Sequence, residues 1–175
     1  MRNKFLSLVV LASISSTALA ASDNVITFQG EVTDETCALT VNGENASPIV
    51  LLPTVTASDL DASGKVAGET SFEIGVSGCT GNAAGVTIST VFVGNQVTTE
   101  GNLGNTGTAG NVDIQVLDKD STVINFANGF KGTGDLKLGA NETSATATYK
   151  AQYYATGKAT VGTVQATLQY AVSYQ

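Results

Sequence analysis

The chain has 175 residues, a formal net charge of −7 at pH 7, no histidine and no tryptophan. An acidic chain whose one arginine stands at position 2 is a poor candidate to bind nucleic acid, because phosphate recognition needs Lys and Arg contacts. Without histidine the chain also lacks the usual catalytic base and a common metal ligand. We therefore expect neither an enzyme nor a metal or cofactor site.

The first 20 residues have the features of a secretory signal peptide. Arg2 and Lys4 form a short positive region, an apolar run follows from Phe5 to Ile14, and residues 18–20 form a small-x-small cleavage site. The apolar run is too short to span a bilayer. The pattern predicts an exported mature chain that begins at Ala21 and carries a net charge of −9, since the two basic residues are the only charges removed.

Short runs of alternating apolar and polar residues recur along the mature chain, separated by turn-forming Gly and Asn. Such runs are typical of strands with one buried face, and turns every 8 to 12 residues or so indicate an all-β sandwich. The predicted strands span residues 26–32, 37–41, 49–52, 71–76, 85–93, 112–117, 123–126, 145–154 and 163–174. Residues 57–60 fit a short helical turn.

Cys37 and Cys79 are the two cysteines of the chain. In an exported protein such a pair is typical of one disulfide bond. This bond would close a loop of roughly 40 residues and stabilise the fold by about 4 kcal/mol. Two free thiols do not suit an oxidising compartment, and a metal site would need ligands that the missing histidines do not supply.

Three other patterns have a structural and a functional interpretation. The Gly-rich segment 101–110 lacks the Lys-Ser/Thr ending of a phosphate loop and is predicted to be a flexible surface loop. Residues 118–121 (DKDS) resemble part of a calcium loop but lack its Gly and distal Glu, which favours a hairpin turn. Tyr149, Tyr153 and Tyr154 could line a sugar site, but packing at the sheet face with the hydroxyl in water is the favoured interpretation.

Both ends of the mature chain are amphipathic strands. Near the N-terminus, Ile26, Phe28, Gly30 and Val32 alternate with polar residues, so a glycine stands on the apolar face. In the C-terminal segment GTVQATLQYAVSYQ, every second residue is again apolar or aromatic. A highly regular strand at a chain end is unusual, because termini tend to fray.

In these features the sequence resembles the pilin subunits of chaperone–usher fimbriae of Gram-negative bacteria. The shared features are Phe28-x-Gly30-x-Val32 ahead of Cys37, a second cysteine that ends the segment SFEIGVSGC, Gly162 as the fourteenth residue from the end, and a penultimate Tyr174. Residues 52–55, 63–68 and 151–160 are most similar to major subunits of enteric fimbriae whose separate tip adhesin binds N-acetylglucosamine.

The resemblance implies an incomplete immunoglobulin-like sandwich that lacks its last strand and is completed by donor-strand exchange. Residues 21–36 would be the donor arm and residues 37–175 the pilin domain. The implied donor-strand residues are Ile26, Phe28, Gly30 and Val32. The implied edge of the groove that accepts a chaperone strand or the next arm consists of Gly162, Val164, Leu168, Tyr170, Val172 and Tyr174.

The resemblance also implies a function and a set of partners. The expected function is that of a structural subunit in the shaft of a surface fimbrium, reached by export through the periplasm. The expected partners are a periplasmic chaperone, an outer-membrane usher, further copies of the chain, and tip or adaptor subunits. Two alternatives stay open at this point: a minor adaptor subunit, and a single-domain polymeric adhesin that binds a host receptor directly.

Overall fold

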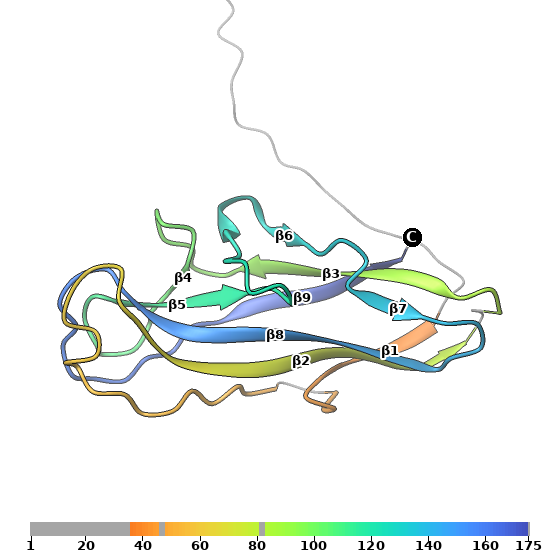
Figure 1. The fold of residues 1–175 in the computed structure, drawn as a ribbon, viewed down its shortest axis with the longest axis horizontal. Coiled ribbons are helices and arrows are strands. Elements are labelled where there is room, and N and C mark those ends of the chain that lie inside the picture. The colour runs from red at the N-terminus through yellow and green to blue at the C-terminus, as the bar shows by residue number, and fades with distance from the viewer. Residues whose placement is uncertain (1–35, 46–47, 81–82, 175) are drawn as a thin grey trace, which may run out of the picture. The chain divides into compact units, whose positions relative to one another are not determined.

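The structure is a computed structural model and describes residues 36–45, 48–80 and 83–174. The regular secondary structure in this part of the chain consists of β-strands and one short 3-10 helix, η1 (Figure 1). The elements are β1 Thr36–Val41, β2 Val66–Thr80, β3 Val86–Gly94, β4 Leu103–Gly104, β5 Val112–Leu117, η1 Phe126–Asn128, β6 Phe130–Lys131, β7 Leu136–Leu138, β8 Ser144–Ala155 and β9 Leu168–Tyr174.

The strands form two antiparallel sheets, as an all-β sandwich requires. One sheet has the order β1-β2-β8-β5-β4. In the other, β3 pairs with β6 and β7 along one edge and with β9 along the opposite edge. The longest pairing joins β2 to β8 over almost the whole length of both strands (Figure 1).

The core consists of the apolar residues that alternate along these strands. Ile74 and Val76 of β2 are buried together with Ile88 and Phe92 of β3. The ring of Phe92 meets that of Tyr149 of β8 edge-on, with 5.0 Å between the ring centroids. This contact joins the two sheets through the centre of the core.

The predicted disulfide bond is present and joins Cys37 of β1 to Cys79 of β2. The two residues are 42 positions apart in the sequence, and Cys79 is buried within the core. The bond therefore ties the edge strand of the first sheet to its longest strand.

Strand β5 is buried on both faces, although it carries two polar side chains. Nε2 of Gln152 donates a hydrogen bond of 2.8 Å to Oε1 of Gln115, and Nε2 of Gln115 donates one of 3.4 Å to Oδ1 of Asn102. Asp113 lies on the same face and is 7% exposed. The side chain of Asn102 thus helps to cover the polar face of β5, which sequence alternation alone would assign to solvent.

Several predicted elements have different limits in the structure. Residues 49–52 are in no strand, Val123 forms a single bridge with Leu117, and η1 begins where the predicted strand 123–126 ends. Strands β6 and β7 are too short to give an alternating signal. The predicted hairpin turn is confirmed, since the backbone N–H of Asp118 donates to the carbonyl of Thr122.

Candidate strand-accepting edge

Strand β9 is paired along one edge within the described residues. It runs antiparallel to β3 from the pair Ile88–Tyr174 to the pair Gly94–Leu168, and it pairs with no other described strand. The side chains of Leu168, Tyr170, Val172 and Tyr174 pack against the core, yet they are only half-buried. Residues 169 and 171 between them are exposed. The alternation seen in the sequence is therefore present, and its apolar face is incompletely covered.

A second row of incompletely covered apolar side chains lies on residues 48–55. Val50 and Leu52 are half-buried against the same core, whereas Ile49 and Leu51 are 79% and 81% exposed. This alternation is that of an extended chain, and it explains why the sequence predicts a strand here. No ladder pairs these residues with another described strand, so the segment contributes side chains to the core without joining a sheet.

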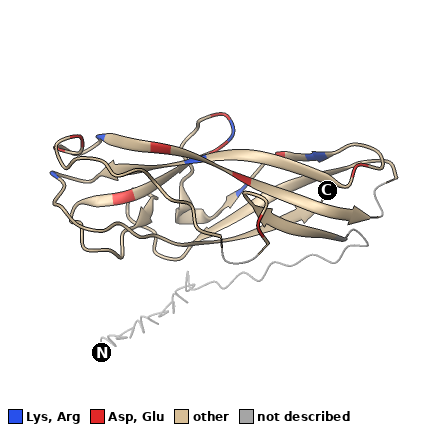
Figure 2. Cartoon of the chain, turned by 90° about the horizontal axis from the view of Figure 1, so that it is seen from below, with Lys and Arg blue, Asp and Glu red and all other residues tan. Residues whose placement is uncertain are grey.

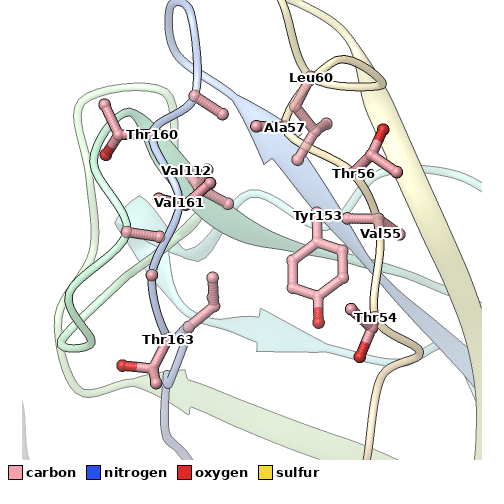
Figure 3. A pocket seen from close by; sticks show the side chains of 14 residues that line it. Thr54, Val55, Thr56, Ala57, Leu60, Val112, Tyr153, Thr160, Val161 and Thr163 are labelled. Atoms are coloured by element: carbon pink, nitrogen blue, oxygen red, sulfur yellow. The ribbon is translucent and has the colours of Figure 1, made fainter.

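A pocket of about 470 Å³ opens between residues 54–57 and residues 160–164 (Figure 3). The ring of Tyr153 from β8 points into it between the two segments (Figure 3). The pocket combines apolar surface with hydroxyl groups, and its other lining residues include Val55, Leu60, Val112, Val164, Thr54, Thr56, Thr160 and Thr163.

Gly68 makes room for the ring of Tyr153. It has a φ of +68°, next to a register shift between Ala67 and Thr70 in β2. A Cβ atom at this position would lie 2.9 Å from two ring carbons of Tyr153. Both the positive φ and the lack of space therefore require glycine here.

The described residues that line the pocket include no charged side chain. The titratable residue among them is Tyr153, and partial burial raises the pKa of its phenol. Elsewhere the charged residues are scattered over strands and loops (Figure 2).

Among the described residues no group of His, Cys, Asp and Glu side chains could hold a metal ion. In the same part of the chain no helix is long and apolar enough to cross a membrane.

The Gly-rich segment 101–110 is not the flexible surface loop that the sequence predicts. Residues 103 and 104 form β4, which pairs with β5. Residues 105–110 are hydrogen-bonded along residues 160–165, and Gly162 packs against Thr108 and Ala109. Glycine-rich composition does not distinguish a loop that moves from one that needs close backbone contact.

The predicted edge residues do not all share one environment. Val164, Leu168, Tyr170, Val172 and Tyr174 lie on one half-buried face, whereas Gly162 is exposed and precedes this row. The predicted donor residues Ile26, Phe28, Gly30 and Val32 lie outside the described residues. Ala166 also belongs to the half-buried face, as its place in the C-terminal alternation indicates, although it is not among the predicted edge residues.

The three tyrosines do not form one cluster. Tyr149 is buried in the core, and its hydroxyl donates to Asp135 rather than to water, so the interpretation of a solvated hydroxyl is wrong for this residue. Tyr153 lines the pocket, and Tyr154 is half-exposed. A shared sugar platform is therefore not formed.

Comparison with known proteins gives a consistent result. A family model described as "Fimbrial protein" matches residues 26–175. The F17 fimbrial protein of Escherichia coli is 41% identical, with 95% of each chain covered. The minor fimbrial subunit HifD of Haemophilus influenzae is 34% identical, with coverage of 95% of this chain and 81% of the relative. Among solved structures, the P pilus rod subunit PapA shares the fold with a TM-score of 0.60 and 18% identity, over 79% of this chain and 99% of PapA.

The all-β, immunoglobulin-like sandwich is the fold that the chain shares with this pilus rod subunit. The family match covers most of the sequence, and the chain belongs to the fimbrial protein family. It is accordingly a subunit of a fimbrium.

Proposed function

We propose that this chain is the repeating shaft subunit of its fimbrium and that copies join head-to-tail by donor-strand exchange. The observation that carries this proposal is the edge of β9 opposite β3, which pairs with no other strand among the described residues and where a row of apolar side chains is only half-buried. Unpaired edges accept further strands, and β-strand addition is a recurring mode of protein recognition. An amphipathic strand from another molecule would both extend the sheet and cover this row.

The N-terminal arm of a second copy, residues 21–36, has the composition for this role. Burial of Ile26, Phe28 and Val32 would contribute roughly 1.5–3 kcal/mol for each side chain. The total of about 5–9 kcal/mol is an upper estimate, because a free arm is partly collapsed. Whole domains are stable by only about 5–15 kcal/mol. One donated strand is thus comparable in free energy to the stability of a subunit.

The proposed contact also determines the form of the assembly. An arm that fills the groove of a different copy makes a heterologous contact that need not close on itself, and such contacts generate filaments. Before assembly, a periplasmic chaperone would cover the same edge, and an outer-membrane usher would pass the subunit on to the growing fibre at the cell surface.

A minor adaptor position is the second candidate. It is supported by the similarity to HifD, which is named a minor subunit. An adaptor would use the same edge and the same arm, so the two roles differ in copy number. Counting this chain relative to other subunits in purified fimbriae distinguishes them, with an excess of many copies expected for the shaft. A polymeric adhesin would in addition bind a host receptor, which purified polymers would reveal in a receptor-binding assay.

Deletion of residues 21–33 tests the proposed exchange. The shortened chain is expected to be exported and to bind the chaperone, because β9 is unchanged, but it has no arm to donate. Polymers are followed on gels loaded without boiling, with the full mature chain as the control. Long polymers formed by the deletion variant alone would refute the proposal.

A further inference from the structure

Two glycines bring the backbones of distant segments into direct contact beside the pocket. A Cβ atom on Gly162 would collide with the backbone of Thr108 and Ala109, and one on Gly107 would collide with the carbonyl of Thr163. Neither glycine has a positive φ. Close approach of the two backbones, rather than backbone conformation, therefore requires glycine at both positions.

Backbone hydrogen bonds join the same two segments. The N–H of Ala109 donates to the carbonyl of Thr163 at 3.0 Å, and the N–H of Thr106 donates to the carbonyl of Gln165 at 2.8 Å. Both acceptors lie ahead of the first residue of β9. We call this arrangement of residues 105–110 against residues 160–165 the clasp.

Side chains of the clasp bind the remaining backbone groups of the same residues. The N–H of Thr163 donates to Oγ1 of Thr108 at 2.9 Å, and the N–H of Gln165 donates to Oδ1 of Asn105 at 2.9 Å. Thr163 and Gln165 are therefore bonded through both backbone groups, and the clasp stands where a neighbouring strand would otherwise be.

The alternation of an extended chain then determines which residues direct their backbone groups away from the clasp. In a strand, the backbone groups of successive residues point to opposite edges. Since residues 163 and 165 face the clasp, the backbone groups of Val164 and Ala166 point away from it. Their side chains are half-buried against the core, like those of β9, and Val164 also lines the pocket.

We propose that the clasp is a positioning element that extends the strand-accepting edge beyond β9, from Leu168 back to Val164. Because Val164 also lines the pocket, the extended edge reaches the pocket. The inference rests on the proposed donor-strand exchange. By holding residues 163–166 extended before a strand arrives, the clasp removes part of the ordering cost of binding. The partner strand is the arm of a second copy, residues 21–36.

Alanine substitutions at the two contact glycines test this inference. A labelled peptide of residues 21–36 is titrated into the full mature chain, purified from the periplasm in monomeric form with any chaperone still bound. Gly162→Ala and Gly107→Ala are expected to weaken peptide binding at least tenfold. Gly104→Ala and Gly157→Ala are matched controls, because a Cβ at either site meets no atom closer than 3.5 Å. They are expected to change binding less than twofold.

A milder pair of variants covers the case in which the glycine variants fail to fold. Thr108→Val keeps the shape of an exposed side chain but removes the acceptor for the N–H of Thr163. It should weaken binding about two- to tenfold, the effect of one typical hydrogen bond. Thr108→Ser retains the hydroxyl and should restore binding to within twofold of the unchanged chain.

Truncated peptides separate positioning from general destabilisation. Only one end of the donated strand can reach residues 164–166, so the penalty of Thr108→Val should persist with one of the peptides 21–30 and 27–36 and be absent with the other. Equal penalties with both peptides, or no penalty with the full peptide, would overturn the role of the clasp while leaving donor-strand exchange intact. Failure of the unchanged chain to bind any of the peptides would overturn both.

Discussion

The hydroxyl of Tyr149 donates a hydrogen bond of 2.5 Å to Oδ2 of Asp135. The same carboxylate accepts hydrogen bonds from the backbone N–H and the hydroxyl of Thr90, at 3.0 Å and 2.5 Å. Tyr149 belongs to β8 and Thr90 to β3, so Asp135 links the two sheets across the sandwich. A polar link of this kind stabilises the fold only if every member keeps its hydrogen-bond partners, because an unpaired buried polar group is destabilising.

Replacing Tyr149 with Phe is therefore expected to lower the free energy of unfolding by about 1–3 kcal/mol. The ring would still pack against Phe92, but Asp135 would lose one of its donors. Urea unfolding measures the change. Tyr154→Phe is the control, since this tyrosine is half-exposed, and it should change the stability by less than about 0.5 kcal/mol. Equal stability of the Tyr149→Phe variant and the unchanged chain would contradict the prediction.

The same phenol makes stability depend on alkaline pH. Burial, followed by the hydrogen bond to Asp135, raises the pKa of Tyr149 above its usual value near 10. Above about pH 10 the folded chain thus binds more protons at this site than the unfolded chain, and stability falls as the pH rises. Tyr149→Phe should make this fall shallower, which thermal unfolding between pH 8 and about pH 11 would show.

Asp113 is expected to reduce stability at neutral pH. Burial, which is the main cause, and the nearby Glu100 raise the pKa of its carboxyl, and Oδ2 has no hydrogen-bond partner among the described residues. The folded state thus favours the protonated form, and stability declines as the pH rises from about 4. Asp113→Asn should stabilise the fold by about 1 kcal/mol at pH 7. The gain should vanish near pH 3, and Asp61→Asn, at an exposed site, should give none.

The apolar face of β9 should be required for binding of the chaperone. Replacing Val172 and Tyr174 together with Ser removes two side chains of the half-buried row. Co-purification with the chaperone and the amount of subunit in the periplasm should both drop severely. Gln169→Ser with Ala171→Ser alters the exposed face of the same strand and should have little effect. Undiminished chaperone binding by the first double variant would rule out this face as the contact.

Gly30 should control the rate of strand exchange. It stands between Phe28 and Val32 on the apolar face of the arm, where a larger side chain would be expected. Glycine within a strand often marks close approach of another group, so the matching part of the groove should be shallow. Gly30→Leu should bind the chaperone normally but polymerise slowly or not at all, with an overpacking cost of about 1–3 kcal/mol. Gln29→Leu, on the opposite face, is the control, and normal polymerisation by Gly30→Leu would show that the groove is not shallow.

Periodicity predicted the positions of the central strands. Residues 112–117 were predicted as a strand and form β5, although both faces of β5 are buried, and the predicted strand 145–154 lies within β8. The disulfide bond followed from the pairing of two cysteines in an exported chain. In these cases the local pattern and the tertiary environment favour the same structure, which is why the sequence was sufficient.

The remaining features depend on contacts between segments far apart in the sequence. Nothing local distinguishes Gly107 as a close-contact residue from a glycine in a mobile loop. The burial of Gln115 depends on Asn102, whose segment folds over β5. The pocket needs Tyr153 from β8 together with two irregular segments on either side of it. Tertiary packing determines each of these features, and an alternating sequence pattern does not predict them.

The half-buried row along residues 164–172 has a calorimetric consequence. A strand that covers this row removes apolar surface from water, and such burial gives a negative change in heat capacity. The enthalpy of association should therefore become more favourable as the temperature rises, in proportion to the apolar area covered. Because hydrophobic stabilisation weakens on cooling, a strand seated on this row would also be held less firmly in the cold.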